Sequence, residues 1–282
     1  MIALFLALSA STCWGASDFL AGLKSRTTAL IVVLLTSQVA GLAALLVAVT
    51  ALDEPPPAER FLLLAALAGV VNVAALGAFY RGLAVSPMGV VAPIAACDAI
   101  VPVIGGTATG DAPTALAGAG ILLAIGGVVL ASRGGDEDGA ASASRGGIAL
   151  AIVAALCFGV FVLALDAASD GGVLWAVLVS RASSVTVLIV AALIACRGAP
   201  PTRREDMRAL VTIGALDVSA TVLFAFAATQ GLISRVGVLG SLYPIVTILL
   251  ARVVLREQLD RLQTAGAAGA LVGAIMLAAA AT

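Results

Sequence analysis

Three ionisable residues lie near the middle of otherwise apolar stretches of this sequence: Asp217, Arg181 and Asp98. Ionised groups avoid apolar surroundings unless they are paired or have a function. One hypothesis is a structural ion pair between Arg181 and either Asp217 or Asp98, which would lower the cost of burying each charge. The other is that one acid binds a substrate amine or a coupling proton, while Arg181 binds a carboxylate.

Uncharged polar and aromatic residues in similar stretches are weaker candidates for a binding site. Gln38 and Asn72 can hydrogen-bond a polar ligand. Aromatic side chains in membrane helices more often pack or lie at the interface, but they can also line a cavity. The aromatic candidates are Trp14, Tyr80 and Tyr243.

Four other acids are expected to meet water. Asp18 and Asp166 come near the ends of their apolar stretches, so we expect both to reach interfacial water. Glu257 and Asp260 lie among arginines in a break between stretches, and we expect a solvated loop cluster there.

The composition indicates that these residues lie in a membrane protein. Of the 282 residues, 62% are hydrophobic and 11% are charged, and the mean hydropathy is +1.17. Soluble domains are about half apolar and about a quarter charged. One water-soluble core cannot hide this much apolar surface, so the chain is expected to lie in a lipid bilayer.

Several classes of function are excluded by what the sequence lacks. It has no histidine, which removes Ser-His-Asp triads, HExxH zinc sites and histidine proton relays. Its one lysine, Lys24, follows Leu23, so no phosphate-binding GxxxxGK loop exists. The four cysteines are widely spaced, and a net charge of -1 without a basic patch argues against nucleic acid. We therefore expect no cofactor, no metal and no enzymatic activity.

Charged and proline-rich breaks divide the chain into apolar runs of the length that crosses a bilayer, roughly 20 residues. Ten such runs are predicted as transmembrane helices of an all-α protein. They cover residues 2–22, 29–50, 61–82, 87–108, 114–131, 147–167, 172–196, 208–230, 234–254 and 262–281.

The two halves of the chain resemble each other. "CWG" at 13–15 corresponds to "CFG" at 157–159, and "LTSQ" at 35–38 to "LVSR" at 178–181, so Gln38 matches Arg181. At a constant shift of 145, Asn72 matches Asp217. The predicted units are five-helix repeats at 1–132 and 147–282, with a linker at 133–146. An odd number of spans per repeat orients the halves oppositely, as in secondary transporters.

The loops give a prediction of orientation. Twelve basic residues follow odd-numbered spans and only two, Arg60 and Arg235, lie on the other side. The positive-inside rule then places the odd loops and the linker in the cytoplasm and both termini outside. In the last span Gly269 and Gly273 form a GxxxG motif. The motif indicates close helix packing within the chain, and the alternative is a contact in a homodimer.

Two segments resemble the paired signatures of EamA-type transporters of the drug/metabolite transporter superfamily: "FYRGLAVSPMGVVAPIAACDAIVP" at 79–102 and "ATQGLISRVGVLGSLYPIVTILLARVVLREQL" at 228–259. "CWGASDF" in the first span and the glycine-rich fifth and tenth spans fit too. The resemblance implies ten helices in inverted repeats that transport small organic solutes, commonly outward. Members of the family often carry a glycine–glutamate pair after both the fourth and the ninth span, whereas this sequence has Gly110-Asp111 at the first place and Arg256-Glu257 at the second. The family's usual cytoplasmic termini also conflict with the charge count.

The sequence thus predicts a multi-pass secondary transporter in the cytoplasmic membrane, which exports small metabolites such as amino acids and uses protons as a coupling ion. A membrane scaffold or sensor is the alternative. An intramembrane aspartyl protease is a third, weak alternative, since neither Asp98 nor Asp217 follows a glycine as in GxGD.

Overall fold

The computed structural model describes residues 2–52, 55–101, 114–131, 144–195, 204–230 and 242–280, and within them the chain forms helices and no strand. Ten α-helices are present there, in agreement with the ten predicted spans. They are α1 (Ile2–Lys24), α2 (Leu30–Leu52), α3 (Glu59–Val85), α4 (Met88–Ala95), α6 (Ala115–Ala131), α7 (Arg145–Ser169), α8 (Val173–Ala195), α9 (Arg204–Gln230), α11 (Tyr243–Val254) and α12 (Arg261–Ala280).

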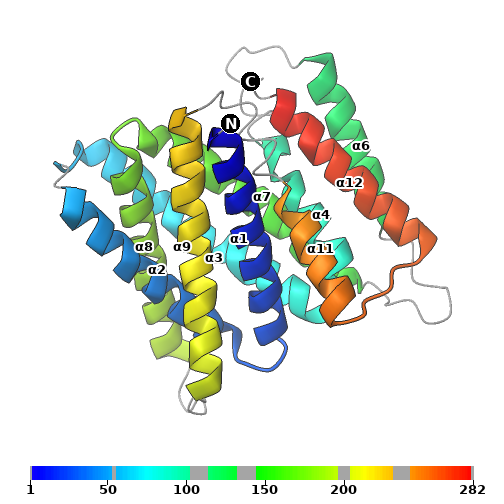
Figure 1. The fold of residues 1–282 in the computed structure, drawn as a ribbon, viewed down its shortest axis with the longest axis horizontal. Coiled ribbons are helices and arrows are strands. Elements are labelled where there is room, and N and C mark those ends of the chain that lie inside the picture. Colours follow the sequence, from blue (N-terminus) through cyan, green and yellow to red (C-terminus); the bar gives the residue numbers. More distant parts are fainter. Residues whose placement is uncertain are drawn as a thin grey trace.

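Length and composition identify the membrane-crossing segments. Five helices are long and apolar enough to span a bilayer, and four shorter apolar helices accompany them. Large apolar side chains such as Leu122, Leu193 and Ile194 are at least 75% exposed, as expected of surfaces that face lipid. The protein is therefore a multi-pass membrane protein. Helix α1 begins and α12 ends at the same end of the bundle, as an even number of crossings requires (Figure 1).

The prolines and caps explain where several helices begin and bend. Helix α3 starts directly after the segment 55–58, which contains three prolines, and Ser144 caps α7 by accepting a hydrogen bond from the Gly147 amide at 2.9 Å. Pro93 lies inside α4, which passes into a short 3₁₀ helix, η1 (Ala96–Ala99). Asp98 lies in this 3₁₀ turn rather than in a regular membrane helix. The part of this predicted span from Pro102 to residue 108 lies outside the described residues.

The packing brings helices from the two halves of the chain together. Helix α1 packs against α9 and α11, α2 against α8 and α9, and α3 against α7 and α8. At one side of the bundle α6 and α12 lie against each other (Figure 1). A Cβ atom at Gly273 would lie 2.5 Å from the Ala124 amide nitrogen of α6. The GxxxG motif of α12 therefore packs against another helix of the same chain, which is the first of the two interpretations that the sequence suggested.

Candidate functional site

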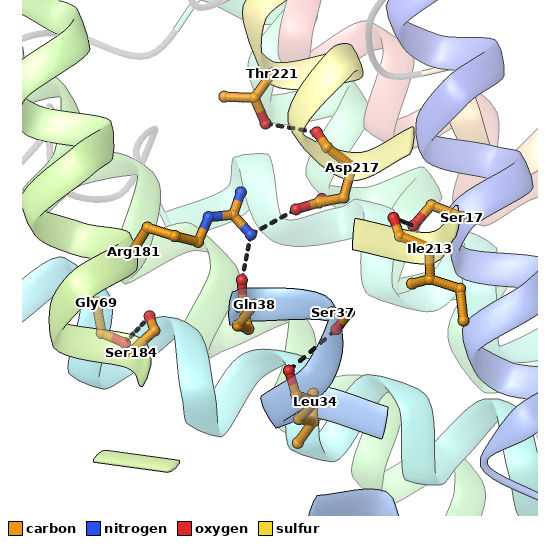
Figure 2. A network of polar contacts seen from close by, with 10 residues as sticks. All are labelled: Ser17, Leu34, Ser37, Gln38, Gly69, Arg181, Ser184, Ile213, Asp217 and Thr221. Atoms are coloured by element: carbon orange, nitrogen blue, oxygen red, sulfur yellow. Dashed lines mark hydrogen bonds and ion pairs between the residues drawn. The ribbon is translucent and has the colours of Figure 1, made fainter. Parts of the chain in front are cut away.

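The ion pair expected for Arg181 forms with Asp217 and not with Asp98. Nη1 of Arg181, on α8, donates to Oδ2 of Asp217, on α9, at 2.6 Å. The same nitrogen donates to Oε1 of Gln38, on α2 (Figure 2). The Arg181 side chain is 9% exposed and that of Asp217 is 22% exposed. A buried cation is thus held by one acid and one amide from two other helices.

Small residues allow these three helices to approach closely enough for the pair to form. A Cβ atom at Gly214, on α9, would collide with the Ser37 carbonyl of α2. One at Gly41, on α2, would lie 2.6 Å from Cγ2 of Val218 and 3.7 Å from Nη1 of Arg181. The side chain of Arg181 therefore reaches its partners across a tight α2–α9 contact.

Asp18, on α1, is a buried acid near this pair. It is only 9% exposed, and within the described part of the chain its carboxylate has neither a hydrogen bond nor an ion pair. It lies within electrostatic reach of Asp217. Its neighbour Ser17 donates to the Ile213 carbonyl of α9 at 3.0 Å, which fixes this part of α1 against α9 (Figure 2).

Tyr80, on α3, connects Asp18 with the ion pair. It is 3% exposed and lies within electrostatic reach of Asp18, Asp217 and Arg181, with its hydroxyl beside Ser17. Side chains from five helices, α1, α2, α3, α8 and α9, therefore converge here. We refer to Asp18, Gln38, Tyr80, Arg181 and Asp217 as the central cluster.

Two further predicted residues flank the central cluster. Tyr243, at the start of α11, lies within electrostatic reach of both Asp18 and Asp98. Thr247, one turn later on α11, donates to the Gly15 carbonyl of α1 at 3.1 Å, so α11 packs closely on α1 beside Asp18. The structure thus brings Asp98 near the cluster through Tyr243, although not into the ion pair.

The remaining candidates, Trp14 and Asn72, have different roles in the packing. Trp14 lies one turn before Asp18 on α1, and its ring contacts that of Phe224 on α9 with centroids 5.3 Å apart. Asn72 is buried on α3 at 8% exposure. Among the described residues, no hydrogen bond joins Asn72 to the central cluster.

The central cluster is suited to bind a positive charge. When ionised, Asp18 and Asp217 carry two negative charges, and Arg181 carries one positive charge. The described residues contain no group of three histidine, cysteine or acidic side chains able to hold a metal ion. With one net negative charge, the cluster can accommodate one further positive charge in a low-dielectric surrounding.

Comparison with known proteins identifies the family that the second half of the chain resembles. Residues 145–279 match the EamA-like transporter family. Over these residues, which make up just under half of the chain, the protein is EamA-like. This family is part of the drug/metabolite transporter superfamily, as the sequence motifs predicted, and its members are membrane transporters.

A solved structure agrees with the fold of the EamA-like protein. A crystal structure of another protein is similar to it with a TM-score of 0.62 and 17% sequence identity, covering 97% of this chain and 95% of that chain. At this identity the likeness concerns the fold alone. No curated protein sequence matches significantly.

Two expectations about acids of this EamA-like protein are wrong. Asp18 does not lie at a solvated helix end, because α1 continues to Lys24 and packs Asp18 against α9 and α11. Asp166 is exposed as expected. The burial of Asp18 depends on which face of α1 meets its neighbours, and a position near the end of an apolar run does not reveal that face.

The second correction concerns Glu257 and Asp260, which are largely buried, although the arginines around them are exposed. The two carboxylate oxygens of Glu257 accept hydrogen bonds from the backbone amides of Met88 and Gly89, both at 3.0 Å. These amides open α4, where an acid complements the helix dipole. Asp260, at 4% exposure, similarly caps α12 by accepting from the Gln263 amide at 2.6 Å. The "REQL" signature is therefore a structural device that ties α11 to α4.

Proposed function

We propose that this EamA-like protein is a secondary transporter that exports small metabolites, such as amino acids, across the cytoplasmic membrane with protons as the coupling ion. The observation that carries the proposal is the buried central cluster. Ionisable residues inside a membrane protein are costly and face the bundle interior, where they mark substrate and ion pathways. The transporter family of residues 145–279 supports the same class of function.

Within this proposal the chain consists of two inverted five-helix repeats, 1–132 and 147–282, joined by the linker 133–146. Contacts that recur at matching positions of the two halves support this division. Gly69 abuts the Ser180 carbonyl, and Gly214 abuts the Ser37 carbonyl, so each glycine–serine contact is the repeat counterpart of the other. Likewise α3 packs on α7 and α8, and α9 packs on α1 and α2. Secondary transporters with such repeats bind substrate between the halves near the bilayer midplane.

The proposed binding residues surround that position. Asp217, Arg181, Gln38 and Tyr80 form its charged and polar part, while Asn72, Asp98, Trp14 and Tyr243 are assigned to its surroundings. In one step of alternating access, a substrate charge would compete with one partner of the Arg181–Asp217 pair. The pair is thus an element with two arrangements, closed on itself or opened by a ligand.

Contacts at one end of the bundle support the idea of a closed gate on that side. Nζ of Lys24, at the end of α1, lies 2.7 Å from Oδ1 of Asp206, near the start of α9. Nη2 of Arg26 donates to the Leu83 carbonyl at 3.4 Å and lies 4.0 Å from Oε1 of Glu257. These polar contacts join α1, α3 and α9 to the α4–α11 corner, and opening this end requires that some of them break.

The alternatives gain no support from the geometry. An aspartyl protease needs two acids that share a proton, but Asp217 is paired with Arg181. A scaffold or sensor without flux does not explain why charges from several helices are buried together. We accordingly propose that the protein is not an enzyme, that its partners are a small molecule, lipid and protons, and that it works as a monomer or a homodimer.

Counterflow in proteoliposomes tests the transport function. Purified protein is reconstituted, and a panel of labelled metabolites is offered with and without a pH gradient. We expect saturable counterflow of at least one class of metabolite and a dependence of net flux on the gradient. If folded protein moves no member of a broad panel, the transport proposal is rejected. If flux occurs but ignores the gradient, only proton coupling is rejected.

A further inference from the structure

The unpartnered acid of the central cluster, Asp18, identifies the charge that the transported molecule must carry. A buried ionised carboxylate is costly unless it is paired or hydrogen-bonded. Asp18 is 9% exposed, and the described residues offer it no hydrogen bond or ion pair. Asp217, in contrast, already has Arg181 at 2.6 Å. Of the two acids, Asp18 is thus the one that lacks a countercharge.

The described groups around Asp18 do not supply that countercharge. From α9 it faces Asp217, which is itself an acid. From α3 it faces Tyr80 and from α11 it faces Tyr243, and both are neutral. The nearby cation is Arg181 on α8, whose Nη1 is bound to Asp217 and Gln38. A positive charge on a ligand would therefore complete the cluster.

The balance of charge also separates classes of ligand. Ionised Asp18 and Asp217 together with Arg181 carry one net negative charge. An organic cation neutralises this charge, a zwitterion leaves it unchanged, and an anion increases it. In a poorly screened interior each uncompensated charge is costly. A ligand carboxylate would meet Arg181, which is already paired, and two neutral donors of the cluster. These are the Tyr80 hydroxyl and the buried Nε2 of Gln38, which has no partner among the described residues.

We infer that Asp18 binds the ammonium group of the transported metabolite, and that the site prefers amines to amino acids and amino acids to carboxylic acids. The inference rests on the proposed transport function and narrows its substrate class. The Trp14–Phe224 ring pair one turn away on α1 provides an apolar surface beside Asp18, which suits an amine with an apolar body.

The same carboxylate binds either a proton or the ammonium group, so the two compete. Protonating Asp18 removes the charge that attracts an ammonium group. Amine affinity therefore falls as the pH falls, by up to about tenfold per pH unit once the carboxyl is protonated. The aliphatic ammonium group itself stays protonated throughout the range from about pH 5.5 to 8. The titration thus reports the protein and not the ligand.

Equilibrium binding to the purified full-length protein in detergent tests the inference. The probe is tritiated phenethylamine, and the competitors are phenethylamine, L-phenylalanine and 3-phenylpropionate, which share one aromatic body. We expect the amine to compete best and the acid worst, with a difference of about tenfold or more between them. An acid that competes as well as the amine would overturn the inference.

Variants of Asp18 provide the second arm of the test. Asp18→Asn should weaken amine binding about tenfold or more and abolish its pH dependence, whereas Asp18→Glu should keep both. Asp166→Asn, at an exposed acid of α7, is the matched control and should bind like the parent. Unchanged, pH-dependent amine binding in Asp18→Asn overturns the inference. If this variant does not fold, Asp18→Glu and the pH profile of the parent decide.

Binding and counterflow together separate the two proposals. Amine binding that needs Asp18 but gives no flux in proteoliposomes supports the amine site and rejects transport. Flux of L-phenylalanine that is equal in the parent and in Asp18→Asn supports transport and rejects the amine site.

Discussion

Nη1 of Arg181 lies 2.6 Å from Oδ2 of Asp217 and also donates to Oε1 of Gln38, so one guanidinium nitrogen ties α8 to α9 and to α2. This single donor explains how an arginine near the middle of an apolar helix is tolerated. It also leaves Asp18 as the acid of the central cluster that has no countercharge among the described residues, which is why the ion pair and Asp18 have different expected roles.

Replacing one partner of this ion pair should destabilise the folded protein more than replacing both partners. Arg181→Met leaves Asp217 as an unpaired, half-buried charge, and the loss of stability should be at or below the lower end of the range of about 3–5 kcal/mol that is typical of a fully buried pair. The double variant Arg181→Met/Asp217→Leu removes both charges and should recover much of that loss. Thermal unfolding in detergent measures this double-mutant cycle. Additive effects of the two substitutions would show that the charges do not interact.

The contact of Gly214 with the Ser37 carbonyl should be intolerant of any side chain. Gly214→Val forces α9 away from α2 and should destabilise the protein by about 1–3 kcal/mol, because overpacking displaces both backbones. A Cβ atom at Gly126, on α6, meets nothing within 4 Å, so Gly126→Val is the control. Equal unfolding temperatures for the two variants would contradict the tight contact. The same shift should separate Arg181 from its partners and reduce ligand binding.

The cap that Glu257 provides to α4 should contribute measurably to stability. Glu257→Ala leaves the Met88 and Gly89 amides without their acceptor and should cost about 0.5–2 kcal/mol. Glu59→Ala, at the exposed start of α3, is the matched control and should have a smaller effect. If the Glu257 variant is as stable as the parent, the cap does not contribute to stability, and the solvated position expected from the sequence would be the better description of Glu257.

Thiol labelling tests the orientation expected from the loop charges. In a variant without the native cysteines, Ala140→Cys places one thiol in the linker 133–146, which lies outside the described residues. The charge count predicts that a membrane-impermeant reagent labels this thiol only after the cells are opened. Labelling from outside intact cells would instead support the orientation that is usual for the family.

Much of the fold could be predicted because lipid imposes a simple local requirement. Runs of about 20 apolar residues had to become helices, and the ten predicted runs correspond to the ten described helices. The fourth run is the exception, since Pro93 and the 3₁₀ turn that contains Asp98 interrupt its regular helix. A proline within a run marks such a break without revealing its geometry.

The candidate site could be predicted only in part. Arg181, Asp217 and Gln38 stood out because charged and amide groups are rare in apolar runs, and the correspondence of Gln38 with Arg181 linked two of them. The partner of Arg181 stayed open between Asp98 and Asp217. Asp18 was missed for a site because its place near the end of an apolar run is equally compatible with a solvated end and a buried one.

The sequence by itself determined the class of protein, the number and limits of most helices, and the rarity of its buried charges, because each depends on hydropathy along the chain. Tertiary structure alone decided that Arg181 meets Asp217, that Asp18 is buried with no partner in the part of the chain that the structure describes, and that Glu257 caps α4. Those outcomes depend on the rotation of each helix about its axis and on close approaches at glycines, which involve residues far apart in the sequence.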